Sequence, residues 1–401
     1  MARFKKDIPF IVLAVLTLLF HIYLWKKTGV AEYGDMLRYD AMSMHLALKG
    51  YLGFGSGPDA FVTPGYPLFV AFLMKIVFLF HGTSLSHIRL IHEIYFVQQL
   101  ISIISLVLIY RIATVMVNRK AGLIASLLSV FYLPMSFVGN MLLTEVLFIP
   151  LLLATLYFFI LGKQKDSKRY YALTGLFLGL TTLVRPNVIP LVILFLLIIY
   201  WPYFREKKAG LYKLMARSWP MLVAVLIVML PWWIRNAIDF HHFIPLSTEA
   251  GNPLLAGGDP YFQVNINQLI AMSRSLHESQ ETFAIHYILQ GFTHHFFLFA
   301  EWFLFGKLGY LFGKPWLYGY LSSFVVYHHV VVFLGFIAMF VGLFVKRLRY
   351  LSLATLLLLL LQLGFLPTAR YGYPIIVLWL IILGALLVEM YTWWHARRMR
   401  A

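Results

Sequence analysis

The chain contains no cysteine among its 401 residues. This absence excludes disulfide bonds, thiolate metal sites and cysteine nucleophiles. Charged residues are also scarce, at 12% of the chain, whereas 61% of the residues are hydrophobic. The basic segments between the apolar runs are short and carry no glycine-rich phosphate-binding loop, so we expect neither ATP-driven nor nucleotide-sugar chemistry there.

Uninterrupted apolar runs near the ~20 residues that a bilayer-crossing helix needs recur along the chain. They predict an all-α polytopic membrane protein, a single transmembrane domain over residues 1–401 with about ten spanning helices. The expected spans lie near residues 8–25, 90–117, 121–138, 146–162, 170–184, 188–204, 218–234, 325–345, 351–366 and 373–391.

The positions of Lys and Arg predict the orientation of these helices, because cytoplasmic loops carry an excess of both. With both termini in the cytoplasm, 20 of the 33 Lys and Arg residues fall in cytoplasmic segments. This distribution explains the net charge of +17 without a nucleic-acid partner. It also requires that the short apolar stretch 66–80, which begins within TPGYP and carries Lys75, lies in the outer interface and does not span. Two long outer segments result, residues 26–87 and 235–324, so we expect the active site on the outer face of the cytoplasmic membrane.

Five charged residues that are far apart in sequence fall at the outer ends of the expected helices: Asp35, Glu145, Arg185, Arg235 and Arg370. Charged residues at membrane depth are costly and tend to mark functional sites. Two acids and three bases are the groups needed to deprotonate a hydroxyl and hold a departing phosphate. Each residue also has a structural interpretation, because a carboxylate can cap a helix and an arginine can reach towards lipid headgroups.

The stretch GDMLRYDAMSMHLALKG predicts a short interfacial helix that begins after Gly34 and ends at Gly50. Asp35 and Tyr39 are four residues apart and share a face of this helix, with Arg38 close enough to orient the acid. Its apolar residues are expected to rest on the membrane surface: Met36, Leu37, Met42, Met44 and Leu46.

These residues resemble the GT-C membrane glycosyltransferases, in the branch of protein O-mannosyltransferase-like enzymes that includes the lipid A aminoarabinose transferases. The resemblance rests on a series of short strings in a fixed order: D-x-x-R-Y and PGYP in the first outer segment, LLTEVLF, LVRPN, PWWIRN followed by HHFIPLSTEAGNPLLAGGDP, and ARYGYP. It extends over roughly residues 8–390, and it implies a GT-C-type helical bundle.

The resemblance further implies an inverting transfer of a sugar from a polyprenyl-phosphate donor to a lipid, glycan or protein acceptor. By this similarity Asp35 is the general base, and Glu145 is a second acid that contacts the acceptor, a metal or the phosphate region. Arg185, Arg235 and Arg370 would bind the carrier phosphate, whose geometry a guanidinium matches. The complete set of expected substrate-binding residues is Arg38, Tyr39, Tyr66, Arg185, Arg235, Asn236, Arg370 and Tyr371.

One position departs from the aminoarabinose transferases, which carry an acidic and a basic residue where this chain has Val62 and Thr63 before Pro64. The ligands of a metal are therefore left unassigned, and a divalent metal is an open expectation with no cofactor certain. Two other functions stay open. A transporter or flippase for a lipid-linked precursor would need charged sites near the bilayer midplane, and a non-catalytic assembly factor would tolerate the loss of Asp35 and Glu145.

Overall fold

The computed structural model describes residues 7–249, 251–316 and 322–399, and these residues form helices joined by turns, with no β-strand. The long bundle contains α2 (Ile8–Lys27), α5 (His87–Met116), α6 (Arg119–Val130), α7 (Pro134–Phe137), η1 (Val138–Asn140), α8 (Glu145–Lys165), α9 (Lys168–Val184), η2 (Pro186–Val188), α10 (Leu191–Tyr200), η3 (Trp201–Glu206), α11 (Lys208–Phe240), α17 (Ser322–Phe344), α18 (Arg349–Leu363) and α19 (Ala369–Arg398). The remaining helices belong to the two expected outer segments: α3 (Asp35–Lys49), α4 (Gly65–His81), α12 (Gly251–Gly258), η4 (Pro260–Phe262), α13 (Ile266–Ser275), α14 (Gln280–His294), α15 (Phe296–Glu301), the π-helix η5 (Trp302–Gly306) and α16 (Lys307–Phe312).

Helix length and composition confirm a multi-pass membrane protein. Among the described residues, 7 helical stretches are long and apolar enough to cross a bilayer, and the bent pair Arg119–Val130 and Pro134–Asn140 makes an eighth if it is one span. The 74° bend of this pair falls where Pro134 interrupts the helix. The spans predicted at 170–184 and 351–366 correspond to α9 and α18, which have only 17 and 15 residues. The count of ten spans therefore stays a prediction.

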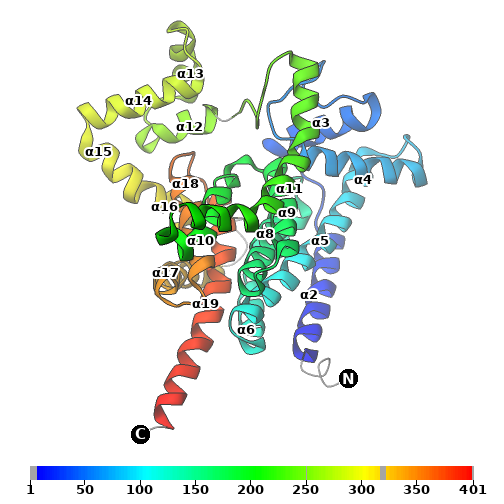
Figure 1. The fold of residues 1–401 in the computed structure, drawn as a ribbon. Coiled ribbons are helices and arrows are strands. Elements are labelled where there is room, and N and C mark those ends of the chain that lie inside the picture. Colours follow the sequence, from blue (N-terminus) through cyan, green and yellow to red (C-terminus); the bar gives the residue numbers. More distant parts are fainter. Residues whose placement is uncertain (1–6, 250, 317–321, 400–401) are drawn as a thin grey trace.

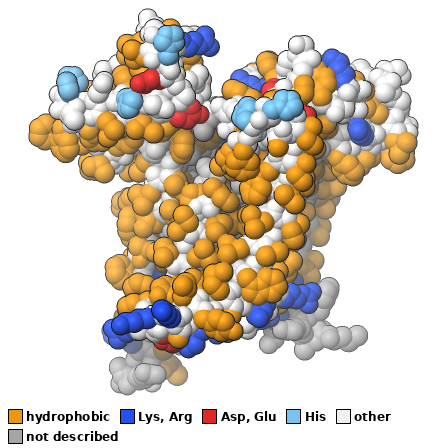
Figure 2. All heavy atoms as spheres, turned by 45° about the horizontal axis from the view of Figure 1, so that its top comes forward, with side chains coloured by type: hydrophobic (Ala, Val, Ile, Leu, Met, Phe, Trp, Pro, Cys, Tyr) orange, Lys and Arg blue, Asp and Glu red, His pale blue; other side chains and the backbone are white. Residues whose placement is uncertain are grey.

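The two termini of the described chain lie at one end of the bundle, and the outer segments lie at the other (Figure 1). In the same view α3 and α4 lie across the end of the bundle, as expected for interfacial helices. Figure 2 shows a broad band of hydrophobic side chains on the visible face of the bundle. Lys and Arg gather below this band, and further Lys and Arg lie above it together with most of the visible His and acidic side chains. Which end faces the cytoplasm stays a prediction from the positions of Lys and Arg.

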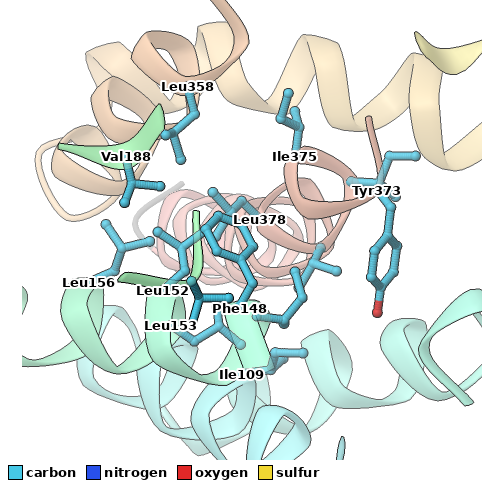
Figure 3. Packing of buried hydrophobic residues seen from close by; sticks show 14 of the residues in the cluster. Ile109, Phe148, Leu152, Leu153, Leu156, Val188, Leu358, Tyr373, Ile375 and Leu378 are labelled. Carbon is cyan, nitrogen blue, oxygen red and sulfur yellow. The ribbon is translucent and has the colours of Figure 1, made fainter. Parts of the chain in front are cut away.

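Helices α8 and α19 form the centre of the bundle. In the most apolar 18-residue segments of α8 and α19, 78% and 72% of the residues are buried. The corresponding share in α2, at the periphery, is 22%. Figure 3 shows Phe148, Leu152 and Leu153 of α8 packed towards Leu378 of α19. Both helices begin at the end of the bundle where α3 lies. Their first turns therefore belong to the two candidate spans with the largest buried share.

The helix predicted after Gly34 is confirmed, since α3 begins at Asp35 and ends at Lys49. Gly34 and Gly50 flank it with φ of 57° and 79°, a conformation that favours glycine. The expected role of its apolar face is only partly correct. Met36 and Met42 are 1% and 0% exposed and pack in the core, whereas Leu37 is 53% exposed. Both methionines belong to the hydrophobic core, and α4 packs against α3.

The orientation can be tested with single cysteines, because the natural chain has none. Ser56→Cys and Ser275→Cys, both at exposed positions of the outer segments, should react with a membrane-impermeant thiol reagent added to intact cells. Lys165→Cys and Lys168→Cys, exposed at the turn between α8 and α9, should react only after the membrane is opened. Labelling of Lys165→Cys in intact cells would contradict the predicted orientation.

Candidate active site

A pocket of about 320 Å³ opens at the end of the bundle where α3 lies. Its polar wall contains Asp35 and Tyr39 of α3, Arg185, Glu249 and Arg370. Part of its apolar wall comes from the end of α9 and the turn that follows: Val184, Pro186, Ile189 and Pro190. Another part comes from Leu361 of α18 and from Phe365, just after that helix. The pocket therefore offers charged groups beside a surface that suits a hydrocarbon chain.

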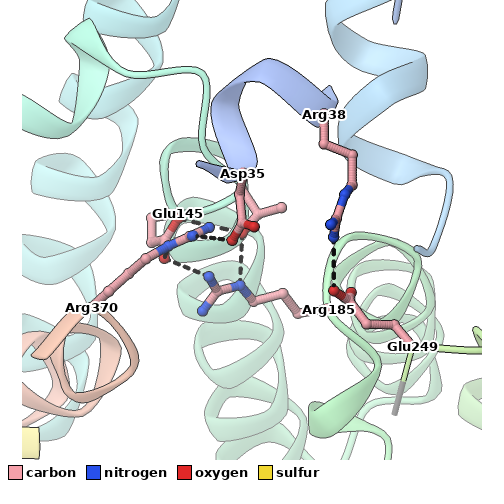
Figure 4. Close-up of polar contacts among 7 residues, drawn as sticks. Asp35, Arg38, Glu145, Arg185, Glu249 and Arg370 are labelled. Atoms are coloured by element: carbon pink, nitrogen blue, oxygen red, sulfur yellow. Dashed lines mark hydrogen bonds and ion pairs between the residues drawn. The ribbon is translucent and has the colours of Figure 1, made fainter. Parts of the chain in front are cut away.

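Glu145 is the innermost charge at this site. It is the first residue of α8, and its side chain is 0% exposed. Its Oε1 atom accepts hydrogen bonds from Nη2 of Arg185 and from Nε of Arg370 (Figure 4). A buried carboxylate is costly unless it is paired and hydrogen-bonded, and here two guanidinium groups provide the pairing.

Asp35 is the accessible acid. It is the first residue of α3, and its side chain is 41% exposed, unlike that of Glu145. Its Oδ2 atom lies 2.7 Å from Nη1 of Arg370, which donates a hydrogen bond to it. Arg370 thus joins the buried acid to the exposed one, as Figure 4 shows.

The ends of the helices favour this arrangement of charge. Glu145 and Asp35 lie at helix N-termini, where the helix dipole stabilises negative charge. Arg185 follows the C-terminus of α9, where the helix dipole stabilises positive charge. Pro186 disfavours a helical conformation at Arg185, which is extended with φ of −145°. The helix therefore ends there, and Nε of Arg185 donates to Oγ1 of Thr144 at 2.7 Å.

A second ion pair borders the pocket and was not predicted from the sequence. Nη1 of Arg38 lies 3.2 Å from Oε1 of Glu249 (Figure 4). Glu249 is held there by its own backbone, because its N–H donates to the carbonyl of Phe61 at 3.1 Å. Burial raises the pKa of Glu249, and the charge of Arg38 opposes this effect. The sequence signal was an isolated acid within HHFIPLSTEAGNP, a string that also carries the family resemblance.

Three tyrosines expected at the site have different positions. Tyr39 and Tyr371 line the pocket, and the ring of Tyr371 lies 5.3 Å from Cζ of Arg185. Tyr66 is 0% exposed and does not line the pocket. Its ring supports that of Tyr39 in an edge-to-face contact at 5.2 Å, and its hydroxyl donates to Oε1 of Gln98 at 2.7 Å.

Arg235 and Asn236, which were also expected to bind substrate, lie outside the cluster. Arg235 donates to the carbonyls of Leu52 and Asp59, each at 2.9 Å, and pairs with Asp239. Asn236 is 0% exposed and donates to the carbonyl of Ile244. Neither residue lines the pocket. The end of α11 uses both to hold neighbouring loops, since those loops have carbonyls that need donors.

The pocket does not offer a divalent cation a set of free carboxylates. Asp35, Glu145 and Glu249 are each paired with arginine, and within the described residues these three acids do not form a group with metal-ligand spacing. Val62 and Thr63, which line the pocket, add no charged ligand. The residues around the pocket therefore do not fit a metal site.

The family model described as dolichyl-phosphate-mannose-protein mannosyltransferase matches residues 64–234. No curated protein sequence shows significant similarity to this chain.

Solved structures with a similar fold include an oligosaccharyltransferase from Archaeoglobus fulgidus. Its apo form gives a TM-score of 0.58 at 14% identity and covers 100% of this chain and 52% of that chain. Its complex with an inhibitory peptide and a dolichol-phosphate, under the name AglB, gives 0.56 at 14% identity, covering 99% and 52%. This chain thus spans about half the length of that enzyme. ArnT from Cupriavidus metallidurans bound to undecaprenyl phosphate gives only 0.41 at 12% identity, over 94% of this chain and 77% of that chain.

The family match and the shared fold confirm the resemblance to the GT-C membrane glycosyltransferases that the sequence predicts. The chain is a multi-pass membrane protein with a GT-C-type helical bundle. The match over residues 64–234 includes Glu145, Arg185 and the PGYP segment, whereas Asp35 and Arg370 lie outside it.

Glu145→Gln should destabilise the protein, because it leaves Arg185 and Arg370 facing a buried neutral group. Removing one partner of a buried ion pair costs about 3–5 kcal/mol, so the thermal unfolding temperature in detergent should fall clearly. Glu206→Gln is the matched control, since Glu206 pairs with Lys213 in an exposed ion pair worth about 0–1 kcal/mol. Equal unfolding temperatures for the two variants would contradict the structural role of Glu145.

Proposed function

We propose that this protein is a membrane glycosyltransferase that moves a sugar from a polyprenyl-phosphate donor to an acceptor hydroxyl at the outer face of the cytoplasmic membrane. The observation that carries the proposal is the pocket itself. It combines an accessible carboxylate, two arginines and an apolar wall in one place. The acceptor is a lipid, a glycan or a protein, and no nucleic acid takes part.

The family match and the shared fold support the class of reaction. The matching family is described by its use of a dolichyl-phosphate-mannose donor, and the oligosaccharyltransferase of similar fold was solved with a dolichol-phosphate. A donor anchored in lipid also suits the topology, because nucleotide sugars are confined to the cytoplasm. The open end of the pocket lies on the side that the charge distribution assigns to the exterior.

The proposed chemistry uses Asp35 as general base. The acceptor oxygen attacks the anomeric carbon of the donor from the face opposite the phosphate, and its proton passes to a carboxylate oxygen of Asp35. The bond between the anomeric carbon and the phosphate oxygen breaks, and the bonding electron pair leaves with the polyprenyl phosphate. Attack from the opposite face inverts the configuration at that carbon.

Arg370 and Arg185 are the proposed phosphate ligands. Both line the pocket, and a guanidinium can donate two parallel hydrogen bonds to a phosphate. Negative charge develops on the leaving phosphate in the transition state, so donors that are already held in place stabilise it most effectively. Glu145 holds both arginines, and in this role it acts as a positioning residue.

The contact between Arg370 and Asp35 gives the proposed order of binding. While Nη1 of Arg370 donates to Oδ2 of Asp35, that oxygen is occupied. A donor phosphate beside Arg370 competes for the same N–H group and releases Asp35 to accept a proton. The donor would then bind before the acceptor, which limits the action of the base to the loaded enzyme.

The donor site can be tested by substituting the arginines. Arg370→Lys and Arg185→Lys keep the charge, but an ammonium group cannot donate two parallel hydrogen bonds to the phosphate. The Kd for a polyprenyl-phosphate sugar should therefore rise about 10- to 100-fold. Arg274→Ala, which removes an exposed arginine from α13, should leave the Kd unchanged. The measurement is donor binding to the purified protein in detergent. Efficient transfer from a nucleotide sugar without any lipid carrier would rule out the proposed donor.

Asp35→Asn should lower the transfer rate by roughly 10²- to 10⁴-fold, because the amide keeps the size of the side chain but cannot accept the proton. The Kd for the donor and the unfolding temperature should stay close to those of the natural protein. Asp239→Asn, an exposed position at the same end of the bundle, is the matched control and should keep its rate. The rate is measured with saturating lipid-linked donor. A rate for Asp35→Asn equal to that of the control would show that another group acts as base.

A further inference from the structure

A second group of titratable side chains lies on the opposite side of α3 from the pocket. Asp40 is five residues after Asp35, so the two side chains point about 140° apart around the helix. Glu32, in the loop after α2, and His87, the first residue of α5, face Asp40. One ligand atom from each of the three residues lies within 4.8 Å of the others.

The contacts within this group leave carboxylate oxygens unpaired. Nε2 of His87 lies 3.3 Å from Oε2 of Glu32 and 3.3 Å from Oδ2 of Asp40. The other oxygens, Oε1 of Glu32 and Oδ1 of Asp40, are buried and have no hydrogen-bond partner among the described residues. The two carboxylate side chains are only 11% and 15% exposed.

A nearby hydroxyl group also lacks a hydrogen-bond partner. It belongs to Tyr95 of α5, which is 1% exposed, and it has no such partner in the described part of the chain. Tyr95 is within electrostatic reach of both Glu32 and Asp40. Buried polar atoms are nearly always satisfied, and a group of them without partners indicates a bound water or ion that protein atoms alone do not represent.

We propose that Glu32, Asp40 and His87 bind a divalent transition metal such as Zn²⁺. Two carboxylates facing each other repel, and a single imidazole that is 43% exposed compensates them poorly. A divalent cation would neutralise both acids and use the neutral nitrogen of His87 as a ligand. Imidazole together with carboxylate favours Zn²⁺ and related transition metals over Ca²⁺ and Mg²⁺, which prefer oxygen ligands alone.

The proposed ion would link α3 to α2 and α5, which are already joined to each other by hydrogen bonds. Nε1 of Trp25 donates to the carbonyl of His92 at 2.8 Å, and Nε2 of His92 lies 3.1 Å from the carbonyl of Trp25, so α2 and α5 are joined side by side. The ligands come from the loop after α2, from α3 and from the start of α5. The metal is thus structural and separate from the pocket, and the proposal does not depend on the function proposed above.

The test measures metal binding to the purified full-length protein in detergent after removal of metals by a chelator. We expect one equivalent of Zn²⁺ to bind and to raise the unfolding temperature, because a ligand that binds only the folded state stabilises it. Co²⁺ should bind in its place and give a visible absorption band. Glu32→Gln and His87→Ala should each weaken Zn²⁺ binding by at least about tenfold, and His81→Ala, an exposed histidine at the end of α4, should not.

Two outcomes would overturn the proposal. One is Zn²⁺ binding that is equally strong in the natural protein, in Glu32→Gln and in His87→Ala. The other is a natural protein that binds neither Zn²⁺ nor Co²⁺ and whose unfolding temperature does not change on their addition. The group would then be a triad of ion pairs made by a protonated His87. If His87→Ala fails to fold, Glu32→Gln decides the question, because it keeps the imidazole and the shape of the carboxylate.

Discussion

The end of the bundle at which α3 lies depends on the burial of one carboxylate. Glu145 has no exposed surface, and its charge is compensated by guanidinium groups that come from the end of α9 and the first turn of α19. An uncompensated charge in that position would cost several kcal/mol. Three helices are therefore held in one relative position by one residue, and α3 is added to them through the contact between Arg370 and Asp35.

This arrangement gives the two acids different parts. Glu145 is enclosed and accepts hydrogen bonds from two arginines, so it organises positive charge at this end of the bundle. Asp35 stands at the free end of the same chain of contacts, is 41% exposed and borders the pocket. One Arg370 side chain donates to both acids. In the proposed mechanism, a phosphate that takes over part of its hydrogen bonding would change the state of Asp35 but not of Glu145. In that mechanism the buried pair would keep Arg370 in place while the exposed pair is exchanged.

Much of the candidate site could be predicted from the sequence, because charged residues are rare in apolar segments. Burying a charge costs free energy, so the few charged residues that occur there tend to lie at helix ends or in paired sites. Asp35, Glu145, Arg185 and Arg370 could be selected from the ends of apolar runs alone, and the bounds of α3 could be taken from its two flanking glycines. Arg235 satisfied the same criterion, but its donors meet loop carbonyls that only tertiary structure brings to it. Glu249 lies in a loop without periodicity. Lys307 is buried and donates to the carbonyls of Leu363 and Phe365, which lie 56 and 58 residues later in the chain. Contacts of this kind depend on distant backbone positions, which residue patterns do not encode.

The two sides of α3 explain why this short helix carries so many charges. One side presents Asp35 to the pocket, and the other presents Asp40 to Glu32 and His87, while Met36 and Met42 anchor the helix in the core between them. A helix of 15 residues is stiff along its hydrogen-bonded backbone, so any rotation that displaces Asp40 also displaces Asp35. The contacts on the far side of α3 therefore contribute to the position of the carboxylate in the pocket, although none of those residues touches it. The charges from Asp35 to Asp40 thus serve a helix that is held on one side and borders the pocket on the other.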